Sequence, residues 1–423
     1  MKKRDYIAIG ERVYSEKLPN GLTVLVDRKA GFNKKYAFFA ARYGGADRRF
    51  KLSGQWVDTP AGIAHFLEHK MFDMKDYNAL ALLSSNGASP NAFTSSGMTA
   101  YHFECTDKFF DNLRILLDFV STPYFTEESV KKEQGIIGQE IRMTEDDPDF
   151  ALYYEFLKCL YAHNPVRDSV AGTVESISEI TAETLYDCHR VFYDPSNMVL
   201  CVAGDVDPQA VADMAERILP KTPGPVPERD YGPEEGMTPV KAYSEKEMDV
   251  GMPMFAFGTN VRAEARGKSF HRQSLTAELA LKLLVGRSSR LYSEMYASGL
   301  INSKFSAAYE TTAGAAYTLF SGEGREAERV RDMVGAEAEK IVRNGADTAL
   351  FERIKRAEAG RTIRGLNSFD NLCYNMADGH FMGYDALEAY ELLRGITAED
   401  AVKFIGESLK SENIALASVK KQQ

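Results

Sequence analysis

The spacing of apolar residues along the first half of the chain switches between the period of a strand and the period of a helix. Residues 18–28 combine an Asn-Gly turn signal with the β-rich run LTVLV, and residues 35–48 end a second apolar run in a Gly-Gly turn. Between 59 and 72 the apolar positions recur every three to four residues, which predicts a helix. Residues 89–106 alternate again around Ser-Ser-Gly and predict a hairpin.

The pattern continues with amphipathic helices and one more strand. These are predicted helices over 107–122, 126–147, 180–198 and 208–220, with a β-rich strand over 198–207. Residues 221–239 then hold five of the 15 prolines and three glycines, a composition typical of a linker. After it the order strand, helix, hairpin, helix returns, over 249–260, 274–299, 301–324 and 326–345. The second half therefore repeats the element order of the first.

This order predicts an α+β protein of two similar domains, each a mostly antiparallel sheet with helices packed on one face. The length of 423 residues is too great for one ordinary domain, and an apolar fraction of 44% can supply more than one core. The expected boundaries are 1–225 for the N-terminal domain, 226–245 for a Pro/Gly-rich linker, and 246–423 for a similar C-terminal domain.

Composition narrows the class of protein. Lys and Arg total 51 against 61 Asp and Glu, and a net charge of -10 argues against a nucleic-acid partner. No apolar stretch has the length of a membrane helix or of a signal peptide, so we expect no membrane partner and a cytoplasmic location. The five cysteines lack CxxC spacing, which is typical of reduced thiols in a cytosol.

Three residues in the helix predicted over 59–72 carry the strongest chemical signal. His65, Glu68 and His69 stand at i, i+3 and i+4, and so share one face of a helix. Two imidazoles one turn apart can reach a single Zn²⁺, and the carboxylate between them can reach a water on that metal. Catalytic zinc needs three protein ligands and an open position for water. The alternative interpretation is an ordinary solvated helix face.

The third ligand is expected among the carboxylates of the helix predicted over 126–147. Glu140 lies 71 residues after His69, and Glu133 lies two helical turns before Glu140, on the same side of the helix. Glu140 is suited to bind the metal, while Glu133 is suited to orient a histidine or hold a proton. For Glu133 a plain surface charge is an equally good reading.

With these residues in place, the chain resembles the pitrilysin, insulinase and mitochondrial-processing-peptidase family, the inverzincins. The resemblance runs through NGLTVLV, AGIAHFLEHKMF, NAFTSS, GQEIRM and GRSSRLYSEMYASGL, and is strongest to the bacterial YmfH-like branch. It implies that His65, His69 and Glu140 bind one Zn²⁺ per chain, with Glu68 as catalytic base and Glu133 as a supporting carboxylate of the catalytic set. It further implies half of a clamshell whose enclosed chamber admits short unfolded peptides to a zinc-dependent endopeptidase.

The family resemblance also gives a role to Asn91, Ala92 and Phe93. They fall where these peptidases pair an edge strand with extended substrate, and such pairing gives affinity with little demand on side chains. The alternative is a plain core hairpin that binds nothing.

One part of the family pattern is missing. Active members carry an Arg, a short spacer, Gly-Leu and then a Tyr, a pair that stabilises the oxyanion. In EMYASGLINSKF, Tyr296 stands near the Arg position and Asn302 near the Tyr position. Arg287, Arg290 and Tyr292 lie nearby at the wrong spacing. We therefore expect a homologous partner subunit that carries the Arg/Tyr pair, in a heterodimer, or a homodimer.

Two other functions compete with a peptidase. A non-catalytic scaffold or binding subunit would fit the missing pair, although a scaffold has no need of a base and three ligands. A zinc hydrolase acting on non-peptide amides is a further alternative.

Overall fold

The computed structural model describes residues 1–422, which fall into two compact units of three chain segments each. Unit 1 comprises 1–141, 169–231 and 363–387. Unit 2 comprises 142–168, 232–362 and the residues from 388 onward.

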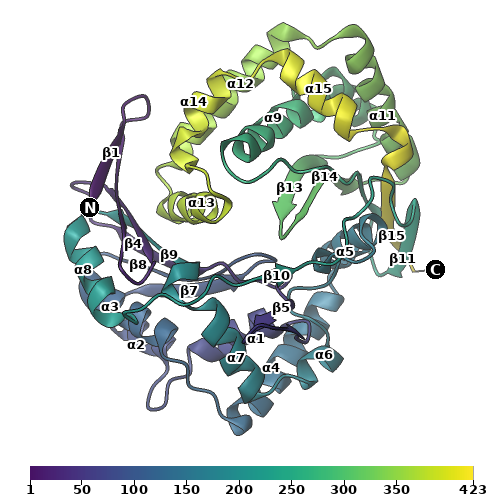
Figure 1. The fold of residues 1–423 in the computed structure, drawn as a ribbon. Helices are drawn as coiled ribbons and strands as arrows, with labels where there is room; N and C mark the ends of the chain where they lie inside the picture. Colours follow the sequence, from purple (N-terminus) through teal and green to yellow (C-terminus); the bar gives the residue numbers. More distant parts are fainter. Residues whose placement is uncertain (423) are drawn as a thin grey trace. The chain divides into compact units, whose positions relative to one another are not determined.

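The main sheet of unit 1 has the strand order β1-β2-β3-β9-β4-β8-β7. Its strands β1, β4, β7, β8 and β9 are labelled in Figure 1. Its neighbours are antiparallel except β3 and β9, which are parallel. The strands are β1 (Lys2–Tyr6), β2 (Glu11–Lys17), β3 (Thr23–Arg28), β4 (Lys35–Ala41), β7 (Ser89–Thr94), β8 (Thr99–Cys105) and β9 (Met198–Gly204). A small second sheet has the order β10-β5-β6, from β5 (Arg49–Leu52), β6 (Gln55–Asp58) and β10 (Arg229–Asp230).

Helices of the first half pack on one face of the main sheet. They are α1 (Ile63–Met71), α2 (Ala79–Ser85), α3 (Phe109–Ser121), α4 (Glu127–Glu145), α6 (Val174–Ser178), α7 (Ala182–Phe192) and α8 (Pro208–Ile218). The opposite face carries α13 (Phe369–Met382), a helix from far later in the chain. Within β4, Ala37 and Phe39 face the first core, whereas Tyr36 and Phe38 face α13. Because both faces are covered, β4 reads as a continuous apolar run.

Unit 2 is built in the same way. Its sheet has the order β11-β15-β12-β14-β13, with β11 (Tyr243–Met248), β12 (Met254–Gly258), β13 (Ser306–Thr312), β14 (Ala315–Glu323) and β15 (Ala415–Lys421). One face packs against α9 (Lys268–Val285), α10 (Arg290–Ala297), α11 (Ala327–Asn344), α12 (Thr348–Gly365), α14 (Ala389–Arg394) and α15 (Ala398–Ser408). The helix predicted over 274–299 is thus two helices, because Gly286 is extended and Ser289 caps a new start.

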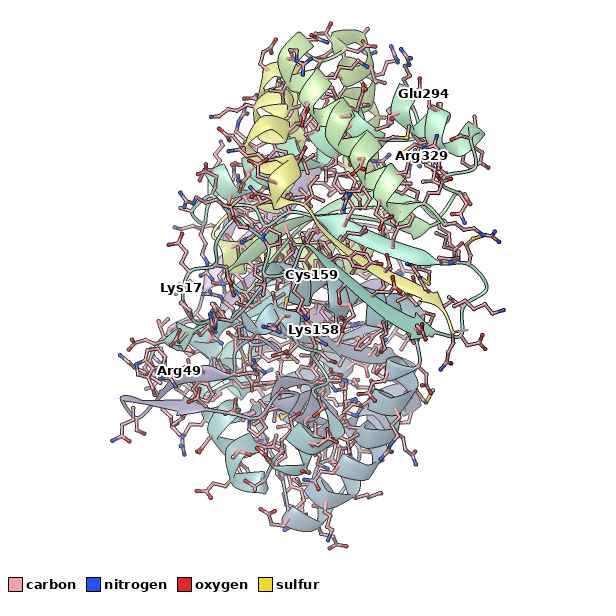
Figure 2. All side chains as sticks on the ribbon, turned by 90° about the vertical axis from the view of Figure 1, so that its right-hand side faces the viewer. Lys17, Arg49, Lys158, Cys159, Glu294 and Arg329 are labelled. Carbon is pink, nitrogen blue, oxygen red and sulfur yellow. The ribbon has the colours of Figure 1, made fainter. Side chains whose placement is uncertain are left out.

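The other face of this sheet carries α5 (Pro148–Leu160), a helix from the first half of the chain. Figure 2 labels Cys159, which is buried in this core, and its neighbour Lys158, whose side chain is partly exposed. Short 3₁₀ turns lie at Pro165–Arg167, Pro195–Asn197, Ala386–Glu388 and Ser411–Asn413.

The two units share one topology. The order β3-β9-β4-β8-β7 of unit 1 corresponds to β11-β15-β12-β14-β13 of unit 2, with the parallel pair at the same place. The fold class is therefore confirmed: α+β, with two similar domains of mostly antiparallel sheet and helices on one face. The helices α5 and α13 depart from the boundaries predicted at 225 and 246, because each buries its apolar side on the sheet of the unit formed mainly by the other half.

The Pro/Gly-rich linker is anchored within each unit. In unit 1, Arg229 forms a buried ion pair with Asp47 at 3.0 Å, and Tyr231 donates to the same carboxylate. In unit 2, the Glu235 carboxylate accepts hydrogen bonds from three successive backbone N–H groups, those of residues 162–164. The composition that predicted a linker therefore did not reveal these ordered contacts.

All five cysteines are free and buried. Across residues 1–422, no helix combines the length and apolar character that crossing a membrane requires.

Candidate metal centre

The helix α1 begins at a position that only glycine fills easily. Gly62, its N-cap, has φ +93°, and a Cβ there would lie 2.5 Å from the carbonyl oxygen of Ala171. Ile63, Ala64, Phe66 and Leu67 then pack into the core of unit 1. Because those positions fix the helix against the sheet, His65, Glu68 and His69 emerge together on the remaining face.

The two histidines and Glu140 of α4 converge. The Nε2 atom of His65 lies 3.5 Å from Oε1 of Glu140, and Nε2 of His69 lies 3.6 Å from Oε2. The three potential ligand atoms all lie within 4.8 Å of one another. Two ligand atoms bound tetrahedrally to one zinc ion would stand about 3.4 Å apart. The spacing and the two-imidazole, one-carboxylate donor set therefore fit a zinc ion.

Glu133 contacts the back of one of these imidazoles. Its Oε1 lies 3.1 Å from Nδ1 of His69, so that the carboxylate can accept the Nδ1 proton. An imidazole that donates from Nδ1 has its Nε2 lone pair free for a metal. Of the two roles considered for Glu133, the contact favours orientation of a histidine. The Nδ1 atom of His65 is buried and has no hydrogen-bond partner among the described residues.

The ionisation of these side chains is strongly perturbed. Burial, with a smaller effect of His69, lowers the pKa of His65 to about 4, so this imidazole is neutral at pH 7, as a metal ligand must be. Burial also acts to lower the pKa of His69, but the hydrogen bond to Glu133 and the nearby carboxylates raise it overall. Burial raises the pKa of Glu68, which makes this carboxylate a better proton acceptor.

Thr94 is a site residue that the sequence analysis missed. Its hydroxyl donates a 2.8 Å hydrogen bond to Oε2 of Glu68. Thr94 follows directly after Phe93 in β7, and alternation along a strand places it on the same face as Ala92. No local pattern marks Thr94, because its role depends on β7 lying beside α1 in the folded chain.

The strand β7 contains Asn91, Ala92 and Phe93 and forms the end of the seven-stranded sheet. It pairs with β8 on one side, in the register Ala92 opposite Tyr101. Among residues 1–422 no strand pairs with its other edge, so that edge can accept a further strand. The ring of Phe93 lies near Phe38 and Tyr374, with centroids at 6.0 Å from each.

The positions of the missing Arg/Tyr pair lie in unit 2. Tyr296 is about half exposed on α10, with its ring stacked on Tyr292. The amide of Asn302 donates to Glu323 at 2.7 Å. Of the other two candidates, Arg290 pairs with Glu294 on its own helix, and Arg287 donates to the Ser303 carbonyl at 3.3 Å.

Known proteins share both the sequence and the fold. Residues 53–174 match the family described as Insulinase (Peptidase family M16), and residues 179–358 match the Peptidase M16 inactive domain. The zinc protease YmfH of Bacillus subtilis is 36% identical over 99% of both chains. The solved structure of an M16-like peptidase from Alicyclobacillus acidocaldarius is 33% identical, covers 97% of this chain and 99% of its own, and has a TM-score of 0.93.

Pitrilysin shares the fold at 17% identity and a TM-score of 0.78, and the similarity covers 99% of this chain but 46% of pitrilysin. The relative's name agrees with the predicted zinc, whereas one ion per chain stays a prediction. With 36% identity over nearly its whole length, the chain belongs to peptidase family M16, the insulinase and pitrilysin family.

Proposed function

We propose that this chain is a zinc-dependent endopeptidase that cleaves short unfolded peptides in an enclosed chamber. The observation that carries the proposal is the convergence of His65, His69 and Glu140, with Glu68 on the same helix face and the open edge of β7 beside it. A zinc ion held by these three side chains would supply a Lewis acid that acidifies a bound water and polarises the scissile carbonyl.

The roles of the chain's own residues follow from their contacts. Glu68 accepts the proton of the attacking water, and its raised pKa lets it pass that proton on to the leaving amine. Thr94 fixes one oxygen of Glu68 and leaves the other free for the proton. Glu133 holds the ring of His69 in the tautomer that presents Nε2.

An extended peptide would bind at the edge of β7 next to Asn91, Ala92 and Phe93. Backbone hydrogen bonds to an edge strand require an unfolded substrate and read little of its sequence. Because Thr94 belongs to this strand, the strand that would hold the peptide also holds the base that acts on it. This coupling would place the scissile bond and the base in a fixed relation.

We further propose that the chain works with a homologous subunit that supplies the Arg/Tyr pair. The positions of that pair are occupied by Tyr296 and Asn302, and the Asn302 amide is engaged by Glu323. Activity should therefore rise by orders of magnitude when such a subunit is added to the purified chain. Full turnover by the isolated monomer would refute the need for a partner.

The Glu68→Gln variant tests the peptidase proposal. The amide is almost isosteric but accepts no proton, so the variant should keep its zinc and lose at least a thousandfold in cleavage of a quenched fluorescent peptide. Glu128→Gln, an exposed change on α4, is the matched control. Unchanged cleavage by Glu68→Gln would exclude this mechanism.

A second candidate function is a binding subunit without catalysis, favoured by the absent Arg/Tyr pair. It predicts that zinc-loaded chain binds peptides but cleaves none, with or without any protein that co-purifies. The two candidates are therefore separated by cleavage measured before and after addition of that protein.

A further inference from the structure

Unit 2 contains a cavity at the place that corresponds to the metal centre of unit 1. In unit 1 the site is formed by α1, α4 and β7. Their counterparts in the shared topology are α9, α12 and β13, and these three elements line a cavity of about 570 Å³. The size is within the range of sites for small ligands.

Charged side chains of this cavity pair with one another and do not form a donor set like that of His65, His69 and Glu140. Lys282 of α9 lies one turn after Glu278, in the i, i+4 relation of His65 and His69, and pairs with both Glu278 and Glu358 of α12. Arg361 completes the pairing of Glu358, whose side chain is buried. An ammonium group therefore lies between carboxylates from the two helices, and the cluster is neutral without any ion.

Two arginines that line the cavity form no ion pair with a carboxylate of residues 1–422. Arg353 of α12 is exposed and has no ion pair or side-chain hydrogen bond among the described residues, and Arg287 contacts only the Ser303 carbonyl. The lining also contains apolar side chains, among them Leu281, Val285, Phe305 and Ile354. The cavity therefore offers apolar side chains together with two guanidinium groups that no described carboxylate neutralises, on a chain whose net charge is -10.

We propose that this cavity binds a carboxylate carried on an apolar body. The apolar part would pack between α9 and α12, and Arg287 and Arg353 would hold the carboxylate, since a guanidinium matches a carboxylate in bidentate geometry. The C-terminal residue of a short peptide and a fatty acid both have this chemistry. The inference does not depend on the zinc site or on catalysis.

The test measures binding by calorimetry to the full zinc-loaded chain carrying Glu68→Gln, which keeps a peptide intact. The probes are acetyl-Ala-Ala-Leu with a free carboxylate, its C-terminal amide, octanoate and octanamide. The variants are Arg287→Gln with Arg353→Gln, and the control is Arg343→Gln, an exposed arginine of α11 that does not line the cavity. Circular dichroism checks that each variant is folded.

We expect at least one of the two acids to bind, its amide to bind at least tenfold more weakly, and the double arginine variant to lose at least tenfold in affinity. The control should bind as the parent chain does. Which acid binds identifies the source, peptide or fatty acid. Binding of neither acid, equal binding of acid and amide, or binding unchanged in the double variant would overturn the proposal. A carboxylate bound at the zinc ion would give the last of these results.

Discussion

Removal of the Glu133 carboxylate should weaken zinc binding without removing a ligand. The Glu133 side chain is 12% exposed, and its Oε1 lies 3.1 Å from Nδ1 of His69. A hydrogen bond to a charged group in such a place contributes about 1.5–3 kcal/mol. Loss of a partner behind a metal-binding imidazole costs about 10–100-fold in metal affinity, which corresponds to about 1.4–2.7 kcal/mol. The two ranges agree.

We predict that zinc affinity falls in the order parent chain, Glu133→Gln, Glu133→Ala. Glu133→Ala should bind zinc about 10–100-fold more weakly than the parent chain. Glu133→Gln should lie between them, because an amide oxygen still accepts the Nδ1 proton but carries no charge. Zinc dissociation constants are measured by competition with a fluorescent chelator, and circular dichroism confirms that the chains are folded.

The control for this series is Glu128→Gln, which removes one negative charge from an exposed position of the same helix. It should bind zinc as the parent chain does. If Glu133→Ala bound zinc as tightly as this control, the reasoning about His69 would be refuted. A loss equal in Glu128→Gln and Glu133→Gln would instead indicate a general effect of charge.

Three further changes test other parts of the structure. Thr94→Val removes the hydrogen bond to Glu68 and should lower kcat by about 10–100-fold, with KM and zinc content unchanged. Thr94→Ser keeps the hydroxyl and should keep most of kcat, so an equal loss of kcat in both variants would contradict the role of the hydroxyl. Arg229→Met leaves Asp47 buried without its ion pair and should lower the free energy of unfolding by about 3 kcal/mol, measured as a lower melting temperature. Adding Asp47→Asn to this variant removes the unpaired charge and should recover part of the lost stability. Burial lowers the pKa of His189 to about 4, so below pH 6.5 the unfolded chain takes up a proton at this residue before the folded chain does, and the free energy of unfolding should fall by up to about 3 kcal/mol between pH 6.5 and 4. The urea midpoint of His189→Gln should therefore fall less steeply with decreasing pH than that of the parent chain, and parallel curves of midpoint against pH would refute this.

The parts of the fold that were predicted from sequence are those whose apolar pattern has a simple period. The hairpin over 89–106 and the long helix over 126–147 are both present, as β7 with β8 and as α4. The period of α4 is visible because this helix buries one face only, and the hairpin is visible from the Ser-Ser-Gly turn between its two β-rich runs.

The parts that were not predicted depend on contacts distant in sequence. The helix α13 was not predicted, and its Cys373 and Met376 pack on β4 and β9, more than 150 residues away in the chain. The hairpin of β5 and β6 was also missed, because its pairing partner β10 lies in the Pro-rich linker. Local periodicity carries no information about such partners.

The residues of the candidate site also divide into those that a local sequence pattern predicts and those that depend on distant contacts. His65, Glu68 and His69 were predicted because ligands on one helix have a fixed spacing, and Glu140 because it lies 71 residues after His69 in a run, GQEIRM, that resembles the family motif. Thr94 was not found, since its role depends on β7 lying beside α1, which no local pattern states. The cavity of unit 2 was not predicted either, because Arg353 lies on α12 and Arg287 lies between α9 and α10, far apart in sequence.

The most direct test of the central proposal is the zinc stoichiometry and the zinc X-ray absorption spectrum of the purified chain. We expect one zinc ion per chain, with four nitrogen or oxygen ligands that include two imidazoles, and loss of the ion in His65→Phe and in Glu140→Ala. A chain that binds no zinc, a sulfur ligand in the spectrum, or an unchanged spectrum in Glu140→Ala would contradict a metal centre formed by His65, His69 and Glu140.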